Sequence, residues 1–247
     1  MSFDGLDISN LSYAYGNKQA LDEVSFQVTK GRFTALLGPN GAGKSTLYHL
    51  LTRILKIQQG KVRLFGADLV ETPLRAMSGL GVVFQQSTLD LDLTVRQNLR
   101  YFAALHGLPG RDLKGRISHR LETLGLADRA DEKVRTLNGG HRRRVEIARA
   151  LLHEPKVLLL DEATVGLDVP SRRAIVEYVH QLCADTGLTA LWATHLVDEV
   201  WADDDLVVLH QGKVQATGAV SALLSEHACD GVAELFEQLT RPAERAA

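Results

Sequence analysis

Apolar and polar residues alternate through most of the segment between residues 6 and 36, as in LDISNLSYAY and ALDEVSFQV. This period of two predicts half-buried antiparallel strands. Two more short β runs, KVRLF at 61–65 and LGVVFQ at 80–85, follow a first helix and are separated by a turn at GADL. The first third of the chain is therefore predicted to consist mainly of strands.

From about Thr94 the apolar residues recur at the spacing of helices. These residues are Val95, Leu99, Phe102, Leu105, Ile117, Leu121 and Leu124. The segment Gly107–Gly110, which contains Pro109, interrupts the pattern and predicts two helices instead of one. We therefore expect a helical insertion at about 86–155.

Continuous apolar runs return in the last third of the chain. They are found at 157–161, 188–194 and 206–210. Such runs are typical of central strands that are covered on both faces. Helices are predicted around 170–186 and 196–202, and two short amphipathic helices at 219–224 and 232–239. The last residues, AERAA, are expected to fray.

Together these patterns predict an α/β fold in a single domain over residues 1–247. Its core is expected at 1–85 and 156–220, its helical subdomain at 86–155 and a helical tail at 221–247. Hydrophobic residues make up 45% and charged residues 23% of the chain, a balance that is ordinary for a globular protein.

Charge and cysteine content exclude several classes of protein. The formal net charge of -2 argues against a nucleic-acid binder, which needs a clustered positive surface, and the run Arg142–Arg144 is interpreted as a solvated helix face. Cys183 and Cys229 share no motif spacing, which favours a reduced cytosolic chain. No stretch approaches the roughly 18 apolar residues that cross a bilayer, and the first residues lack the apolar segment of a secretory signal. We therefore expect no direct membrane insertion.

A glycine-rich segment follows the apolar strand predicted at 33–37 and matches the P-loop pattern G-x-x-x-x-G-K-[ST]. Its residues are Gly38, Pro39, Asn40, Gly41, Ala42, Gly43, Lys44, Ser45 and Thr46. The helix predicted after it has the apolar positions Leu47, Leu50, Leu51 and Ile54. In a P-loop the backbone N–H groups and the helix N-terminus bind phosphates, while Lys44 reaches the β- and γ-phosphates and Ser45 ligates Mg²⁺. The segment predicts a site for a nucleoside triphosphate and Mg²⁺.

The run at 157–161 ends in two carboxylates, Asp161 and Glu162, about 115 residues after the P-loop. A strand that ends in Asp is by itself weak evidence for a Mg²⁺-binding carboxylate, but the evidence is strong when the strand follows a P-loop at this distance in the sequence. Asp161 is expected to hold the Mg²⁺ shell. Glu162 is expected to orient or deprotonate the attacking water.

Further segments occur in the order found in ATP-binding cassette (ABC) proteins, and from about residue 6 to residue 220 the chain resembles that family. The matching residues are Leu137–His141 for the LSGGQ signature, Gln85 for the Q-loop, Gly166–Asp168 for the D-loop and His195 for the switch histidine. Small GTPases would also need an N-K-x-D motif, and Asn17-Lys18 lacks the Asp and precedes the P-loop. The resemblance implies a P-loop core with an antiparallel β subdomain and an inserted α-helical subdomain.

The resemblance also implies roles for these residues. Gln85 would contribute to catalysis and to Mg²⁺ binding, and His195 would contact the γ-phosphate. Asn138, Gly139, Gly140 and Asp168 would act on ATP across an interface between two copies. Tyr15 lies where the family places an adenine-stacking aromatic; Tyr13 is the competing candidate, and an ordinary strand aromatic is the alternative.

Three positions depart from the family pattern. The signature has Asn138 in place of Ser and His141 in place of Gln, and Ala163 stands where Pro is common. An Asn side chain can still donate a hydrogen bond to a γ-phosphate, so we expect the signature to remain competent. The alanine is expected to cost little, because it leaves the backbone angle φ accessible.

In the family, two copies dock head to tail, so that each ATP lies between one P-loop and the other copy's signature. One P-loop and one signature in this chain predict a homodimer. The helical insertion would bind a membrane permease, and the segment Leu89–Val95 is apolar enough to be a docking lip, with an ordinary buried turn as the alternative. The chain is expected to be cytoplasmic and peripheral on the inner face of the cell membrane.

The segment Leu91–Leu108 is most similar to ATPases of multidrug and polysaccharide-type exporters. Together with 137–152 and 191–199 it also resembles a bacterial subgroup associated with pyrroloquinoline-quinone-dependent alcohol oxidation. A second hypothesis is a soluble ABC ATPase of the iron–sulfur assembly kind, which fits by length. A third is a regulatory ATP sensor, against which Glu162 and His195 argue. The cargo is not encoded in residues of this kind.

Overall fold

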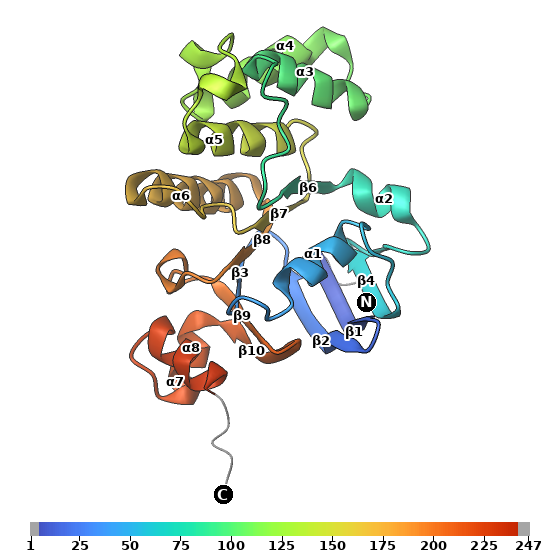
Figure 1. Cartoon of the computed structure of the whole chain (residues 1–247), viewed down its shortest axis with the longest axis vertical. Coiled ribbons are helices and arrows are strands. Elements are labelled where there is room, and N and C mark those ends of the chain that lie inside the picture. The colour runs from blue at the N-terminus through green and yellow to red at the C-terminus, as the bar shows by residue number, and fades with distance from the viewer. Residues whose placement is uncertain (1–4, 242–247) are drawn as a thin grey trace, which may run out of the picture.

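Two β-sheets share the strands of this chain, and three helices form a separate group at the top of the view in Figure 1. The structure, a computed structural model, describes residues 5–241. The smaller sheet has the strand order β2-β1-β4-β5 and the larger one the order β10-β9-β3-β8-β7-β6. In Figure 1 the smaller sheet and the three helices lie on different sides of the larger sheet.

The smaller sheet is antiparallel, as its alternating sequence predicts. Its strands are β1 (Gly5–Tyr15), β2 (Lys18–Thr29), β4 (Gln59–Leu64) and β5 (Ala67–Asp68). On β1 Leu6 and Ile8 are buried, because alternate residues of a strand face the same side. A register shift between Ile8 and Leu11 keeps Leu11 buried as well. The prediction of half-buried antiparallel strands is confirmed for β1 and β2, whereas residues 33–36 of the same segment belong to a fully buried parallel strand of the larger sheet.

The larger sheet is parallel except for its edge strand β10. Its strands are β3 (Phe33–Leu37), β6 (Leu80–Val83), β7 (Val157–Asp161), β8 (Thr189–Thr194), β9 (Asp205–His210) and β10 (Lys213–Ala219). Every residue of β3, β7 and β8 is buried. Successive residues pack into two different hydrophobic clusters, since Leu158 faces one and Leu159 the other. Burial on both faces explains the continuous apolar runs.

Helices cover both faces of the larger sheet and build the group at the top of Figure 1. They are α1 (Lys44–Leu51), α2 (Pro73–Ser78), α3 (Val95–Leu105), α4 (Gly110–Thr123), α5 (Gly139–Ala150), α6 (Val169–Thr186), α7 (Val220–His227) and α8 (Val232–Thr240). Single 3-10 turns are η1 (Ala127–Arg129), η2 (Val134–Thr136) and η3 (Val197–Glu199). The top group consists of α3, α4 and α5. The predicted break between two helices at Gly107–Gly110 is confirmed.

Three details of the predicted elements are wrong. Residues 196–202 form only the turn η3, because Leu196 and Val200 adopt extended backbone angles on either side of it. Helix α1 ends at Leu51, so Ile54 lies outside it and is 60% exposed. More than the predicted turn at GADL separates the runs near 61 and 80, because Ala67 and Asp68 form the short strand β5 and α2 follows it.

The order of strands places three chain segments at one edge of the larger sheet. Strand β8 lies between β3 and β7, and all three run parallel. The residues that follow them directly are Gly38, His195 and Glu162. Parallel strands therefore bring together the P-loop, the predicted switch histidine and the predicted catalytic carboxylate.

Among residues 5–241, no helix has both the length and the apolar character needed to span a bilayer. The tail residues predicted to fray lie outside the described residues.

Candidate active site

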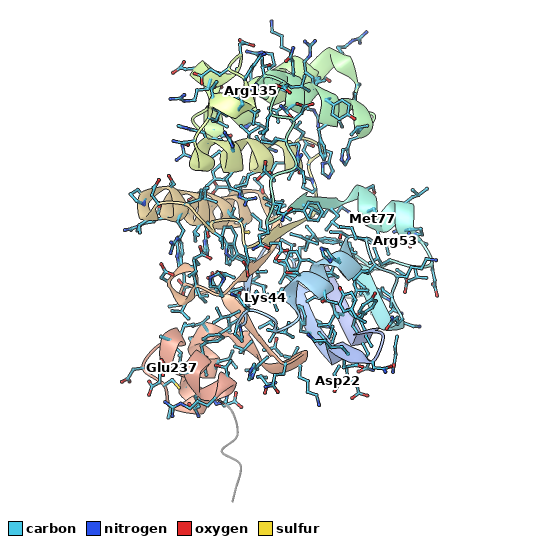
Figure 2. The ribbon with its side chains drawn as sticks, viewed as in Figure 1. Asp22, Lys44, Arg53, Met77, Arg135 and Glu237 are labelled. Atoms are coloured by element: carbon cyan, nitrogen blue, oxygen red, sulfur yellow. The ribbon has the colours of Figure 1, made fainter. Side chains whose placement is uncertain are left out.

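A cavity of about 790 Å³ opens at this edge of the larger sheet. Of the predicted site residues, those lining it are Tyr15, Asn40, Gly41, Gly43, Lys44, Ser45, Thr46, Gln85, Glu162 and His195. The start of β2 at Lys18–Gln19 and the turn at Gln211–Gly212 also line it and carry no motif that sequence inspection would detect. In Figure 2 the label of Lys44 lies between the smaller sheet and the strands of the larger one. The cavity thus lies where both sheets contribute to its wall.

The P-loop needs glycine at two places for steric reasons. A Cβ atom on Gly38 would lie 2.5 Å from the backbone oxygen of Leu209 on β9. On Gly43, where φ is +113°, it would lie 2.8 Å from the backbone oxygen of Ala20. These positive-φ and close-approach positions let the loop fold tightly and begin α1 at Lys44.

Lys44 is buried, and three oxygen atoms contact its ammonium group. Its Nζ donates to the backbone oxygens of Gly38 at 2.7 Å and Pro39 at 3.3 Å, and lies 3.4 Å from Glu162 Oε1. A buried ammonium group needs such partners. The contacts fix the charge of Lys44 inside the cavity that the P-loop surrounds.

Glu162 is the centre of the cluster. Its φ of +47° lies in the left-handed region, which is uncommon outside glycine, and its carboxylate contacts side chains from three other segments. Gln85 Nε2 donates to Oε2 at 3.0 Å, while His195 Nδ1 and Lys44 Nζ each lie 3.4 Å from Oε1. Gln85, Glu162, His195 and Lys44, predicted from four separate motifs, are therefore in contact in the folded chain.

Asp161, at the end of β7, is the neighbouring buried carboxylate. Burial and the negative charge of Glu162 raise the pKa of Asp161 to about 6. Its Oδ1 atom is buried, and no residue of the described chain gives it a hydrogen-bond partner. A buried carboxylate oxygen with an unused acceptor position fits the oxygen ligands that Mg²⁺ prefers.

Tyr15, and not Tyr13, lines the cavity. Tyr15 is 48% exposed, and the two rings meet edge to face with their centroids 5.0 Å apart. The exposed ring of Tyr15 is thus supported from the side by Tyr13. This arrangement leaves Tyr15 the better placed of the two candidates for stacking on a base.

The signature and D-loop residues do not line this cavity. Asn138 caps α5, and its Oδ1 accepts from His141 N at 2.8 Å. Asp168 caps α6 and accepts from Ser171 N at 2.8 Å; this backbone hydrogen bond holds the pKa of Asp168 below its usual value. The two caps adjoin, because a Cβ on Gly140 would lie 2.9 Å from Ser171 Oγ. The structure therefore brings these two motifs together with each other but not with the P-loop of the same chain.

The interpretation of Arg142–Arg144 as a solvated face is wrong for Arg143. Its side chain is buried and donates to the backbone oxygens of Phe84 at 2.6 Å and Gln85 at 2.8 Å. It also pairs with Glu146 at 2.7 Å. The three-residue spacing of Arg143 and Glu146 on a helix was the available signal for this contact. Helix α5 thus clamps the backbone that carries Gln85.

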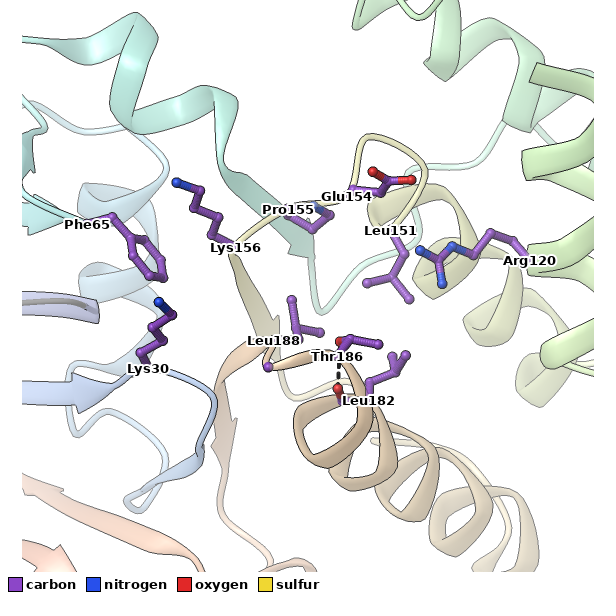
Figure 3. A pocket seen from close by; sticks show the side chains of 11 residues that line it. Lys30, Phe65, Arg120, Leu151, Glu154, Pro155, Lys156, Leu182, Thr186 and Leu188 are labelled. Atoms are coloured by element: carbon purple, nitrogen blue, oxygen red, sulfur yellow. Dashed lines mark hydrogen bonds between the residues drawn. The ribbon is translucent and has the colours of Figure 1, made fainter. Parts of the chain in front are cut away.

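A second hollow, of about 510 Å³, lies at the opposite edge of the larger sheet, where β3, β7 and β8 begin. Figure 3 shows Lys30, Phe65, Arg120 and Lys156 among the side chains around it. None of the predicted site residues lines it. This hollow therefore has no part in the predicted chemistry.

A parallel sheet whose first central strand leads through a P-loop into a buried helix, with two carboxylates after a neighbouring strand, defines the class of P-loop nucleotide-binding proteins. The profile of one family within this class, described as ABC transporter, matches residues 21–165. The linearmycin resistance ATP-binding protein LnrL of Bacillus subtilis is 36% identical over 231 residues, which cover 93% of this chain and 74% of that protein. The Nod factor export ATP-binding protein I of Paraburkholderia xenovorans is 39% identical over 233 residues, which cover 94% and 76%.

Solved structures agree with these sequence matches. An ATP-binding subunit of an ABC transporter superposes with a TM-score of 0.85 at 28% identity, over 96% of this chain and 99% of that one. CbiO1 of Clostridium perfringens, part of the ABC transporter complex CbiONQ, superposes with a TM-score of 0.81 at 30% identity, over 90% and 91%. The chain belongs to the ABC transporter family and is an ATP-binding subunit, which implies ATPase activity. The predicted fold class is confirmed; the exact domain boundaries and the narrower subgroup stay predictions.

Proposed function

We propose that this chain hydrolyses ATP at a site completed by a second copy, and that hydrolysis drives export through a separate membrane permease. The observation that carries the proposal is the contact of Glu162 with Gln85, Lys44 and His195 in one cavity. A carboxylate beside a phosphate-binding lysine is the arrangement that activates water against a γ-phosphate.

Each side chain has a role that its position supports. Lys44 and the P-loop N–H groups bind the phosphates, which replace the contacts of Lys44 Nζ with the loop carbonyls. Glu162 accepts the proton of the attacking water, Gln85 and His195 position that carboxylate, and His195 also donates to the γ-phosphate. Mg²⁺, held by Ser45, Asp161 and Gln85, would neutralise charge on the phosphate oxygens.

The separation of the two half-sites supports a dimer. Asn138, Gly139 and Gly140 begin α5 at the surface, outside the cavity that contains Lys44. A helix start of this kind binds phosphate, so we infer that it binds the ATP held by a second copy. Asp168, in contact with the same helix start through Ser171, then lies at the interface. Identical copies give a symmetric pair of sites.

A third hollow, of about 530 Å³, fits the surface that would bind a permease. It lies beside the Q-loop, and its lining includes Phe84, Tyr101, Phe102, Leu105 and His106. Tyr101 and Leu105 on α3 are both more than half exposed. In the predicted docking lip, Leu89 and Val95 are buried while Leu91 is exposed, so only part of that segment can contact a partner.

The inference of transport, and of its direction, rests on the names of similar proteins. The relatives named above have export or resistance in their names, and CbiO1 is part of a transporter complex. We infer the same kind of partner here, with the chain peripheral on the cytoplasmic face of the membrane. None of these names supports the iron–sulfur assembly alternative.

Substitution of the central carboxylate tests hydrolysis. Glu162→Gln is expected to lower kcat by about 10²–10⁴-fold, the usual value of a general base, while ATP binding is retained. Steady-state kinetics and equilibrium ATP binding measure the two effects. The exposed Glu177 on α6 supplies the control variant Glu177→Gln. Hydrolysis at the parent rate by Glu162→Gln would refute the proposed mechanism.

The transport part is tested on native membranes. The tagged full-length chain should be recovered from detergent extracts with a polytopic membrane protein in a fixed ratio. Introducing a charge at Leu91, as Leu91→Lys, should weaken this association and spare ATP binding, since Leu91 is exposed outside the P-loop cavity. Recovery with soluble partners only would contradict the transporter assignment while leaving the ATPase assignment intact.

A further inference from the structure

Glu199 is a buried carboxylate that none of the recognised motifs contains. It lies at the end of the turn η3, four residues after His195, and only 2% of it is exposed. A buried carboxylate is costly unless several donors satisfy it. Its surroundings therefore show what the fold uses it for.

The two carboxylate oxygens of Glu199 bind two different loops of the active site. Oε1 accepts from the hydroxyl of Thr164, two residues after Glu162. Oε2 accepts from Thr194 Oγ1 at 2.5 Å, directly before His195, and from Trp192 Nε1 at 3.0 Å. All three donors are buried. One side chain thus connects the loop of the catalytic carboxylate with the turn of the switch histidine.

The hydrogen bonds continue into the backbone of both segments. Thr194 Oγ1 also accepts from Leu196 N at 3.0 Å, which fixes the turn around His195. Within the other loop, Val165 N donates to Glu162 O at 3.2 Å. Because hydroxyl groups at both ends are oriented by Glu199, the positions of the two loops depend on the same carboxylate.

We propose that Glu199 is a positioning residue for ATP hydrolysis, which sets the distance between Glu162 and His195 through Thr164 and Thr194. The inference rests on the proposed roles of Glu162 and His195. Glu162 Oε1 and His195 Nδ1 lie 3.4 Å apart. Each residue belongs to a segment whose threonine hydroxyl donates to Glu199. Small displacements of reacting groups have large effects on rate. The P-loop meets Thr194 through the backbone, where Gly38 N donates to Thr194 O at 3.2 Å, so loss of the threonine hydroxyl leaves that contact in place.

Two hydroxyl-to-methyl substitutions test the proposal with little change of shape. Thr164→Val cuts the link to the Glu162 loop, and Thr194→Val cuts the link to the His195 turn. Each is expected to lower kcat by about 10-fold to 10²-fold and to leave the dissociation constant of ATP within about twofold. The double variant should lose less than the product of the two single losses, because both act through Glu199.

Thr34→Val is the matched control. Thr34 lies on β3, is as buried as Thr164, and its Oγ1 has no hydrogen-bond partner in the described part of the chain. The same substitution there should leave kcat unchanged. Thermal unfolding of all variants, as full-length chains, separates loss of stability from loss of turnover.

The outcomes distinguish the two proposals. Lower kcat with unchanged ATP binding in both Thr164→Val and Thr194→Val, but not in Thr34→Val, would support the positioning role. If Glu162→Gln abolishes turnover while both threonine variants keep the parent kcat, the inference about Glu199 is wrong and the proposed function stands. If kcat falls only in proportion to the unfolding midpoint, Glu199 is structural, which also overturns the inference. If Glu162→Gln keeps turnover, the proposed function itself fails.

Discussion

His153 shows how much a single side chain depends on its neighbours. It lies beside α5 in the hollow proposed to bind a permease, its ring is stacked on His106 with the centroids 4.1 Å apart, and its Nε2 lies 3.0 Å from Leu80 O. Because that carbonyl can only accept, Nε2 carries the proton and the buried Nδ1 is the unprotonated nitrogen. Burial, and then the charge of His106, lower the pKa of His153. Arg149 and Asp90 are the other charged groups that line this hollow.

The contribution of His153 to stability should therefore decrease in mild acid, whereas Asp161, whose pKa is raised to about 6 in the folded chain, contributes in the opposite direction. Since the pKa of His153 is lower in the folded chain than the ordinary histidine value of 6.5, the unfolded chain binds more protons as the pH falls below that value. The contribution to stability is complete above pH 6.5 and is lost as the pH falls through the folded pKa. Thermal melts from about pH 8 to about pH 5 should show this loss as a difference: the parent should lose more stability, or gain less, than His153→Phe as the pH falls. An identical pH profile for His153→Phe would contradict the argument, and His119→Phe, at an exposed position on α4, is the control.

Among the elements, helix α5 connects the two halves of the nucleotide site. Its first residues are the signature, and one turn later Arg143 holds the backbone oxygens of Phe84 and Gln85. Farther along, Arg149 donates to Thr88 O at 3.0 Å. A shift of the Q-loop in response to ATP is therefore expected to move the signature helix with it.

Breaking this clamp should destabilise the chain strongly. Arg143→Met leaves Glu146 buried without its cation, and removal of one partner of a buried ion pair costs about 3–5 kcal/mol. Urea unfolding measures the change. The exposed pair Arg173–Glu177 on α6 supplies the control Arg173→Met, which should cost about 0–1 kcal/mol. Equal losses in the two variants would show that the Arg143 contact contributes no more than a surface pair.

For the whole molecule, the main feature is that the predicted site residues of one chain form two separate groups. The P-loop cavity contains Lys44 and Glu162 but no residue of the signature. Gly139 and Gly140 instead pack against Leu167 and Ser171 of the same chain. Neither half-site can surround a triphosphate alone, which is the physical reason to expect ATP-dependent pairing of two copies.

A mixing experiment tests the composite site. Lys44→Ala disables the P-loop, and Gly139→Asp places a negative charge where a phosphate would bind; each variant alone should be inactive. In an equimolar mixture about half of the dimers are mixed, and each mixed dimer has one intact P-loop facing one intact signature. The mixture should therefore regain hydrolysis, measured as phosphate release. A mixture as inactive as its components, although both variants fold and dimerise, would refute a site shared between copies.

Sequence alone determined the features that lie within contiguous stretches. The strand, glycine loop and helix around Lys44 were predicted because neighbouring residues define them, and the apolar runs at β7 and β8 revealed strands covered on both faces. The family order of the motifs predicted which residues act together, and the contact of Gln85, Lys44 and His195 with Glu162 agrees with that prediction.

Only the tertiary structure decided the contacts between distant segments. The clamp of Arg143 on Gln85 spans 58 residues and the hydrogen bond of Glu199 to Thr164 spans 35. Periodicity reports which side of an element is buried, but not which group a buried charge meets there. For this reason the sequence predicted Arg143 at the surface, although its side chain is buried. It also predicted a helix at 196–202, where the structure has only the turn η3 with the buried Glu199 at its end. Arg143 and Glu199 are both charged side chains, and the burial of each depends on hydrogen-bond partners from another part of the chain.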